Sequence, residues 1–214
     1  METIDQHVHR VLRALVRLDR DLVRPRNFND THPRIINNQL FWPWFKNCVG
    51  VLDGTHVSAW VRAEIQERYR NRYSGLSQNV LAVCDHDMRF VYVRVGYEGS
   101  THDARILRNT LLDLNLGFPM APEGKYYAGD TAYTNMPRFM APFRGARGTQ
   151  HERANYLIAT QNNIVLACCT LHNFIRDNMP NDMYFNEEAA LGALADAQDA
   201  GNEVQGGQNF DFSQ

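Results

Sequence analysis

Two long stretches of the sequence carry apolar residues at steps of three or four, the spacing that places them on one face of an α-helix. The first stretch covers residues 4–22 and the second covers residues 162–178. The apolar positions of the first are Ile4, Val8, Val11, Leu15, Leu18 and Leu22. Those of the second are Ile164, Cys168, Leu171 and Ile175. We therefore predict two amphipathic helices that use these faces for packing.

Between these helices the pattern changes to short apolar runs, which predict β-strands. The runs are residues 49–53, 79–84, 90–96 and 125–130. Asp85-His86-Asp87 separates the second run from the third and predicts a hairpin turn. The first and fourth runs both end in an aspartate.

A helical pattern over residues 103–114 separates the third strand from the fourth, and Ser100, Thr101 or Asp103 is available as its N-cap. Short connections imply that the first three strands are antiparallel neighbours, and the helical crossover permits a parallel fourth strand. The predicted fold is therefore α/β, with a mixed sheet flanked by helices.

Three segments differ in character along the chain. Residues 1–40 form a helical arm followed by a loop, residues 41–178 contain the predicted sheet, and residues 179–214 are acidic and rich in small and polar residues. We expect this last segment to be a largely disordered tail. An aromatic cluster opens the middle segment, and we interpret it as a packing anchor for the helical arm. Its members are Phe41, Trp42, Trp44 and Phe45.

The composition excludes several classes of protein. A hydrophobic content of 44% is typical of a globular protein. No apolar run is long enough to span a membrane, and METIDQHVHR does not have the pattern of a secretory signal. The four cysteines show no CxxC pair, so we expect reduced thiols in an intracellular protein.

The charge is unevenly distributed. All 22 basic residues lie within residues 1–176, and every one except Lys46 and Lys125 is an arginine. The rest of the chain carries only acidic charges, which leaves the formal net charge at −2. Because arginine makes bidentate contacts to phosphate, the basic body is compatible with binding to nucleic acid, although many cytosolic enzymes have a similar balance.

Asp53 and Asp130 are the leading candidates for chemistry, because each ends a predicted strand. Functional groups gather at strand ends in sheets of this kind. Two converging carboxylates would repel each other unless a hard divalent cation lay between them, and paired cations of this kind serve phosphodiester chemistry. The alternative is that each aspartate stabilises a turn, since Asp-Gly and Asp-Thr are common turn dipeptides.

Four long phrases of the sequence are informative together. They are FWPWFKNCVGVLDGTHVSAWV (41–61), RYRNRYSGLSQNVLAVCDHDMRFVYVRVGYEGSTHDARIL (68–107), KYYAGDTAYTNMPRFMAPFRGAR (125–147) and ATQNNIVLACCTLHNFIRD (159–177). They contain a DGTH box, a GS-x-HD box and a GD-x-x-Y box, in this order. In these phrases and in the order of the boxes, the sequence resembles the Harbinger-type DDE transposases and the nucleases derived from them.

The resemblance implies a ribonuclease-H-like fold, with an antiparallel 3-2-1 meander and a parallel fourth strand beside the first. It implies that Asp53 and Asp130 are two acids of a DDE triad and bind Mg²⁺ or Mn²⁺. It also implies a DNA substrate and a nuclear location, with the cytoplasm as the alternative if a partner is needed for import. Only one predicted helix precedes the aromatic cluster, so a Myb-like partner could supply DNA binding.

The third acid of the triad is not found where the resemblance places it. The family has a Glu within an Arg-Asn-x-x-Glu-Arg phrase, and this sequence passes from Arg147 almost directly to the closing helix. We interpret residues 148–158 as the site of an internal deletion that truncates the fold. Glu152 lies in this gap and is a candidate for the missing ligand, although its His-Glu-Arg context does not match the motif.

Other residues are candidates for supporting roles. His56, His102 and Asp103 belong to the matching boxes, where they would orient or polarise the two aspartates; Asp103 is also a candidate helix cap, and His102 could simply donate to the backbone. Arg68, Arg70 and Arg72 would contact phosphates, or form a solvated polar face.

Two functions remain open from the sequence. The first is a metal-dependent endonuclease that cleaves DNA, domesticated or impaired because the third acid is missing. The second is an inactive transposase-derived remnant that acts as a binding or interaction protein. Because the deletion removes a helix that would cover the sheet, we also expect exposed apolar surface, with poor solubility or homo-oligomers as the result.

Overall fold

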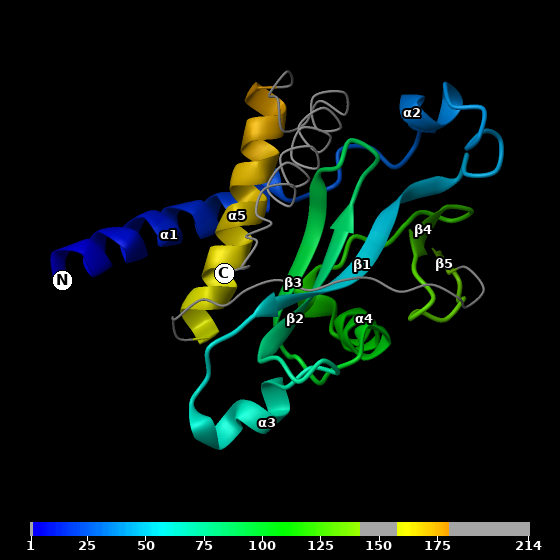
Figure 1. Cartoon of the computed structure of the whole chain (residues 1–214). Helices are drawn as coiled ribbons and strands as arrows, with labels where there is room; N and C mark the ends of the chain where they lie inside the picture. Colours follow the sequence, from blue (N-terminus) through cyan, green and yellow to red (C-terminus); the bar gives the residue numbers. More distant parts are fainter. Residues whose placement is uncertain (1, 142–157, 180–214) are drawn as a thin grey trace, which may run out of the picture. The chain divides into compact units, whose positions relative to one another are not determined.

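The computed structural model of the 214-residue chain describes residues 2–141 and 158–179 (Figure 1). Its helices and strands, in chain order, are α1 (Glu2–Leu22), α2 (Pro33–Ile36), β1 (Cys48–Ser58), the 3-10 helix η1 (Ala63–Ile65), α3 (Gln66–Tyr69), β2 (Ser77–Cys84), β3 (Phe90–Glu98), α4 (Asp103–Leu112), the 3-10 helix η2 (Leu114–Leu116), β4 (Tyr126–Gly129), β5 (Phe139–Met140) and α5 (Ile158–Asn178). Glu152, residues 148–157 of the predicted deletion site (148–158) and residues 180–214 of the predicted tail lie outside the described residues.

The five strands form one mixed sheet in the order β3-β2-β1-β4-β5. β1 pairs antiparallel with β2, and β2 pairs antiparallel with β3 across the predicted Asp85-His86-Asp87 turn. β4 runs parallel to β1, and β5 runs parallel to β4. The predicted fold class is therefore confirmed, and β5 is an additional short edge strand that the sequence pattern did not reveal.

β1 is longer than the predicted run of residues 49–53, which ended at Asp53. Residues 54–58 also pair with β2, from Gly54 opposite Leu81 to Ser58 opposite Ser77. The strand continues because β2 supplies hydrogen-bond partners along this whole length, although the sequence there is no longer apolar. The prediction that the first strand ends at Asp53 was therefore wrong, and this aspartate lies within β1.

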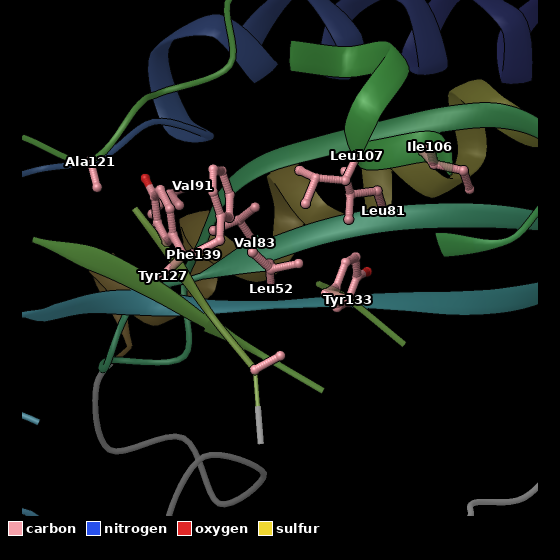
Figure 2. Packing of buried hydrophobic residues seen from close by; sticks show 11 residues of the cluster. Leu52, Leu81, Val83, Val91, Ile106, Leu107, Ala121, Tyr127, Tyr133 and Phe139 are labelled. Carbon is pink, nitrogen blue, oxygen red and sulfur yellow. The ribbon is translucent and has the colours of Figure 1, made fainter. Parts of the chain in front are cut away.

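The main core lies between the sheet and α4 (Figure 2). Leu52 of β1 and Leu81 of β2 are almost completely buried, and they pack with Ile106 and Leu107 of α4. Tyr133, which follows β4, belongs to the same cluster. Alternate strand positions face opposite sides of a sheet, so the buried Val80 lies on the other face from Leu81. The sheet thus has buried side chains on both faces at its centre.

The N-cap of α4 is His102, and its side chain makes no capping hydrogen bond. Asp103 is the first residue of the helix, so Ser100, Thr101 and Asp103 were all wrong as predicted N-caps. Ser100 instead donates its hydroxyl hydrogen to the backbone oxygen of Arg68. The Asp103 side chain accepts a hydrogen bond from a neighbouring strand, which removes it from the capping geometry.

The predicted apolar face of α5 is not the buried one. Cys168 and Leu171 are exposed, whereas Cys169, Thr170 and Asn173 are buried. The helix is anchored through polar side chains because it meets backbone groups that need hydrogen-bond partners. Gln161 exchanges two hydrogen bonds with the backbone of Trp60, at 2.9 and 3.2 Å.

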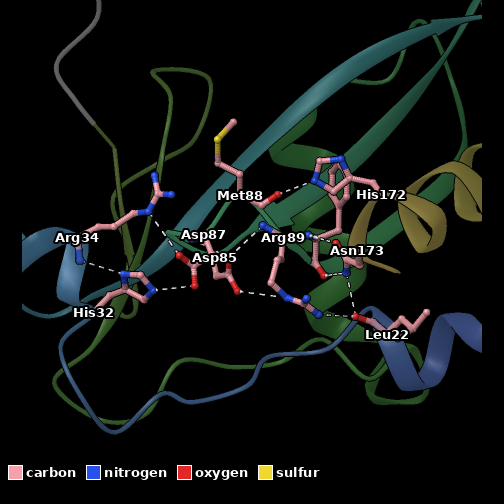
Figure 3. A network of polar contacts seen from close by, with 10 residues as sticks. Leu22, His32, Arg34, Asp85, Asp87, Met88, Arg89, His172 and Asn173 are labelled. Carbon is pink, nitrogen blue, oxygen red and sulfur yellow. Dashed lines mark hydrogen bonds and ion pairs between the residues drawn. The ribbon is translucent and has the colours of Figure 1, made fainter. Parts of the chain in front are cut away.

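A polar network joins the end of α1, the β2–β3 hairpin and α5 (Figure 3). Asn173 donates to the backbone oxygens of Leu22 and Phe90 and accepts from the Phe90 N–H. Arg89, which is buried, donates to the same Leu22 oxygen. His172 bonds with the carbonyl oxygen of Met88 at 2.8 Å, so this histidine has a structural partner.

The N-terminal elements do not bury their apolar residues as the pattern predicted. On α1, Leu12 is buried, but Ile4, Val8, Val11 and Leu18 are exposed. The aromatic cluster over residues 41–45 is exposed as well, and Trp44 retains 77% of its accessible surface. Its interpretation as a packing anchor was therefore wrong, since all four side chains are exposed, and Phe41 and Phe45 make an edge-to-face contact with each other.

The chain divides into two units, Met1–Asn173 and Phe174–Gln214. The sheet, the core and the network belong to the first. All four cysteines are free thiols. Among the described helices, none combines the length and apolar character that crossing a bilayer requires.

Candidate functional site

A cavity of about 1060 Å³ opens at one end of the sheet. Its walls come from β1, the start of β2, the loop after α3, the β3–α4 turn and the segment after β4. Most of the lining residues are polar or charged. Asp53, Asp103 and Asp130 all line it, so the structure brings three carboxylates from distant parts of the sequence to one place.

The register of the parallel pair places Asp53 and Asp130 side by side. Leu52 of β1 is opposite Gly129 of β4, and each aspartate is the next residue along its chain. The backbone N–H of Gly54 donates to Asp53 Oδ1 at 2.7 Å, and the N–H of Ala132 donates to Asp130 Oδ1 at 2.9 Å. Each carboxylate is thereby oriented through one oxygen, while its Oδ2 has no hydrogen bond within the described ranges.

Asp103 approaches the same place from α4. Its Oδ1 accepts a hydrogen bond of 2.5 Å from Asn79 Nδ2, and the same amide group donates to the backbone oxygen of Thr101 at 2.8 Å. A Cβ atom on Gly54 would collide with the Asp103 carboxylate. Glycine at this position therefore lets Asp103 lie directly against β1, next to Asp53.

The three carboxylates influence one another electrostatically. Burial raises the pKa of Asp53 above its ordinary value, the Gly54 hydrogen bond opposes this, and the charges of Asp130 and Asp103 raise the pKa further. Within residues 2–141 and 158–179, none of the three forms an ion pair with a basic side chain. The negative charge of this site is therefore not neutralised by the described part of the protein.

Tyr133 lies beside the acids as well as in the core. Burial raises the pKa of its hydroxyl, and the charges of Asp103, Asp53 and Asp130 raise it further. The hydroxyl is buried and has no hydrogen-bond partner in the described part of the chain. A buried polar atom of this kind marks a position where a ligand or water could bind.

His56 lies on β1 and lines the cavity, as its place after Asp53 suggested. Its Nδ1 bonds with the Ser77 hydroxyl at 3.0 Å. Burial lowers the pKa of His56, the charge of Asp103 raises it, and the charge of Arg72 lowers it. The net shift is downward, so His56 is neutral at pH 7. His102 also lines the cavity, at the N-cap of α4.

The carboxylates suit a hard divalent cation. Mg²⁺ prefers oxygen ligands and is commonly held by one or two carboxylates, with substrate phosphates completing its coordination. Asp53 and Asp130 provide such a pair, and their excess negative charge favours a cation. In the described ranges, no three His, Cys, Asp or Glu side chains are placed to hold one ion together. Asp53 and Asp130 thus fit a cation that the protein holds with these two carboxylate ligands.

The structure distinguishes the three candidate arginines. Arg68 forms an ion pair with Glu98, and Arg70 bonds with Glu67 at 3.4 Å and with the backbone oxygen of Ser74 at 3.0 Å. Arg72 lines the cavity and lies over the Tyr73 ring, with 5.0 Å between its Cζ atom and the ring centroid. Arg72 is therefore the one of the three that faces the site.

Sequence reasoning did not single out Asn79 and Tyr73, which both line the cavity. Asn79 is a polar residue at the start of an apolar run, which is the only local signal of its buried hydrogen bonds. Tyr73 lies within a matching phrase, but nothing in the pattern distinguishes it from other tyrosines there. Tyr133 carries the signal of the GD-x-x-Y box, without any indication of its contact with the acids.

A comparison with protein families agrees with this geometry. A family model described as DDE superfamily endonuclease matches residues 52–162, which is just over half of the chain. The match includes Asp53, Asp103 and Asp130. No curated protein and no solved structure matches the chain. Because the family model covers the sheet and the carboxylates together, the chain belongs to the DDE superfamily endonuclease family.

Proposed function

We propose that this chain is a divalent-metal-dependent endonuclease of the Harbinger type that cleaves phosphodiester bonds in DNA. The observation that carries the proposal is the Leu52–Gly129 register, which sets Asp53 beside Asp130 on the wall of a polar cavity. Endonuclease chemistry is general to the family, whose members normally use divalent metals. The Harbinger assignment rests on the order of the DGTH, GS-x-HD and GD-x-x-Y boxes.

Asp53 and Asp130 would hold Mg²⁺ or Mn²⁺. A cation bound there would activate the attacking oxygen and neutralise charge on the phosphate. The protein orients the two carboxylates: the Gly54 and Ala132 N–H groups each donate to one carboxylate oxygen, and the other oxygen has no hydrogen bond within the described residues. His56, neutral at pH 7, adds no repelling positive charge beside the cation.

Asp103 contributes the third negative charge of the site. The sequence lacks the phrase that contains the family's glutamate, and Asp103 already lines the cavity beside Asp53. Asn79 holds one of its oxygens, so Asp103 acts on the cation through its charge at short range rather than as one of three direct ligands. This role is consistent with the two-ligand arrangement described above.

Titration of the full chain with Mn²⁺ by isothermal calorimetry tests the proposal. We expect a single class of site with a dissociation constant in the millimolar range or below. Asp53→Asn and Asp130→Asn should abolish binding, because each removes a ligand. Asp103→Asn should weaken binding severalfold, because it removes charge and keeps an acceptor for Asn79.

Glu123→Gln is the matched control, since Glu123 is exposed and does not line the cavity. It should bind Mn²⁺ as the unchanged chain does. The same variants are then compared in cleavage of supercoiled plasmid DNA with Mn²⁺. Absence of binding, or binding that Asp53→Asn and Asp130→Asn leave intact, would support the alternative that the chain is an inactive remnant serving in protein interactions.

We also propose a nuclear location and a Myb-like DNA-binding partner. Support comes from the resemblance of residues 41–147 to the Harbinger-type nucleases, which implies such a partner. Fluorescent tagging with and without a co-expressed Myb-like protein tests both points. Nuclear accumulation that depends on the co-expressed protein is the expected result, and cytoplasmic retention in both cases would contradict it.

A further inference from the structure

We propose that Arg72 and Tyr73 form a subsite for one nucleotide of a single DNA strand, on the wall of the cavity that contains Asp53 and Asp130. This inference rests on the proposed function, because the subsite would bind the DNA strand that the same site cleaves. In it, Arg72 binds a backbone phosphate and the Tyr73 ring stacks on an unpaired base.

The loop that carries the two residues is rigidly built. Asn71 accepts hydrogen bonds through its Oδ1 from the N–H groups of Tyr73 and Gly75, both at 3.0 Å. Its backbone N–H donates to the Gly75 oxygen at 2.8 Å, and its backbone oxygen accepts from Ser74 N–H at 2.9 Å. Arg70 closes the loop by donating to the Ser74 oxygen. A loop ordered in advance loses little entropy on binding a ligand.

The side chains of Arg72 and Tyr73 are left available by this arrangement. The internal hydrogen bonds of the loop use its backbone and the side chains of Asn71 and Arg70. Tyr73 retains 46% of its accessible surface, and Arg72 is exposed with no ion-pair partner within the described residues. The contact between guanidinium and ring holds both groups together at the cavity wall.

The loop is also connected to the strand that carries Asp53. Asn71 Nδ2 donates to the Ser77 hydroxyl at 3.1 Å, and that hydroxyl bonds in turn with His56 of β1. Ser77 is 2% exposed, so the hydroxyl that links Asn71 to His56 belongs to a buried residue. The position of Arg72 and Tyr73 relative to the carboxylates is therefore defined by a continuous set of hydrogen bonds.

The chemistry of the two walls indicates a nucleic-acid strand. An exposed aromatic ring beside an arginine is the combination that binds single strands, through base stacking and phosphate contact. A duplex does not present base faces to such a ring. The carboxylates on the other wall would repel an acidic ligand, except where a cation bridges them to a phosphate. A DNA strand can place one base on Tyr73 and one phosphate at Arg72, and it can place another phosphate at a cation held by the carboxylates.

Fluorescence anisotropy on the full chain tests the proposal, with a labelled single-stranded DNA of about ten nucleotides. Titrations are run in EDTA and in Mn²⁺, at several salt concentrations. Tyr73→Ala should raise the dissociation constant about tenfold and leave the salt dependence unchanged, because stacking carries no charge. Tyr73→Phe should bind as the unchanged chain does. Arg72→Ala should weaken binding and reduce the salt slope by about 0.7, the value for one phosphate of a single strand.

The matched controls remove the same kinds of group elsewhere. Arg10→Ala removes an exposed arginine from α1, and Trp44→Ala removes an exposed aromatic ring from the segment before β1. Neither residue lines the cavity, so both variants should bind the oligonucleotide normally. Unchanged melting temperatures establish that each variant is folded.

The subsite and the proposed function fail in different experiments. If Arg72→Ala and Tyr73→Ala bind no more weakly than the two controls, the subsite is wrong, even where Mn²⁺ binding depends on Asp53 and Asp130. Equal affinity for duplex DNA, with no effect of Tyr73→Ala, would also overturn it. Loss of strand binding in both variants supports the subsite, whether or not the calorimetric test of the metal site succeeds.

Discussion

At the scale of single residues, Asp53 illustrates the conflict between stability and function at this site. Its carboxylate lies beside two further acids and has no basic partner in the described ranges. Burial and these charges favour its protonated form in the folded state. Sites that bind cations commonly have this unfavourable charge arrangement in the absence of the ion, and substitutions there tend to stabilise the fold.

We expect Asp53→Asn to raise the melting temperature at pH 7 by about 1–3 °C. Because the folded pKa is raised, protonation of Asp53 stabilises the fold fully below pH 3.8, and this contribution is lost as the pH rises through the folded value. The charged form is therefore the less favourable one at pH 7. The gain in the free energy of unfolding from Asp53→Asn should stay below about 1 kcal/mol, because Asp53 is exposed and solvent screens its charge.

Scanning fluorimetry from acidic to neutral pH measures this effect. The difference between variant and unchanged chain should disappear towards pH 3.8, and Mn²⁺ should stabilise only the unchanged chain. Glu123→Gln should melt as the unchanged chain does across this pH range, and Mn²⁺ should stabilise it to the same extent. A melting temperature lowered at pH 7 would show that the Asp53 charge stabilises the fold, contrary to this account.

At the scale of the elements, packing alone does not explain how the helices attach to the sheet. α4 attaches through apolar side chains, as its sequence pattern indicates. α5 attaches through Gln161 and Asn173, which bond with backbone groups of distant segments. Asn173 is completely buried and satisfies three backbone atoms at once, so it joins α1, β3 and α5.

Replacing Asn173 with alanine should therefore lower the free energy of unfolding by about 2–4 kcal/mol. The substitution removes three hydrogen bonds and leaves buried backbone atoms of Phe90 unsatisfied. Urea denaturation measures the loss, and hydrogen exchange at the Phe90 amide should become faster. Asn109→Ala, at an exposed position of α4, is the control and should change stability by less than about 0.5 kcal/mol. Equal stability of the two variants would refute the anchoring role.

At the scale of the whole molecule, exposed apolar surface is the feature with the clearest consequence. Exposed apolar side chains occur along α1 and in the segment before β1. Leu40 and Trp44 retain 80% and 77% of their accessible surface, respectively. Exposed apolar side chains in such numbers favour association. The separate expectation that a deletion exposes apolar surface on the sheet stays a prediction, because residues 142–157 lie outside the described residues.

We expect the purified chain to self-associate as its concentration rises. Light scattering coupled to size-exclusion chromatography should show a mass above that of the 24.6 kDa monomer. The double variant Leu40→Ser and Trp44→Ser should shift the population towards the monomer, while Leu114→Ser, at a separate exposed position, should not. A monodisperse monomer at every concentration would contradict the prediction.

Local patterns and matching phrases in the sequence were sufficient for the order of the first four strands and for the hairpin turn. These features depend on short-range alternation and on matching phrases, which the chain carries without reference to distant residues. The length of β1 was not predictable in this way, because residues 54–58 are held by pairing with β2 rather than by their own apolar character.

Tertiary structure alone decided which side chains meet. Asp103 lies 50 positions after Asp53 in the numbering, and only the packing of α4 on β1, with glycine at position 54, brings the two carboxylates together. The sequence spacing does not distinguish Arg68, Arg70 and Arg72 from one another. In the folded chain, Arg68 pairs with Glu98 and Arg70 bonds with the Ser74 carbonyl oxygen. Of the three, only Arg72, over the Tyr73 ring, faces the cavity. The buried face of α5 likewise depends on the backbone atoms that the helix meets. Periodicity reports the preference of a segment for burial, whereas electrostatic and hydrogen-bond partners are set by long-range contacts that no local pattern contains.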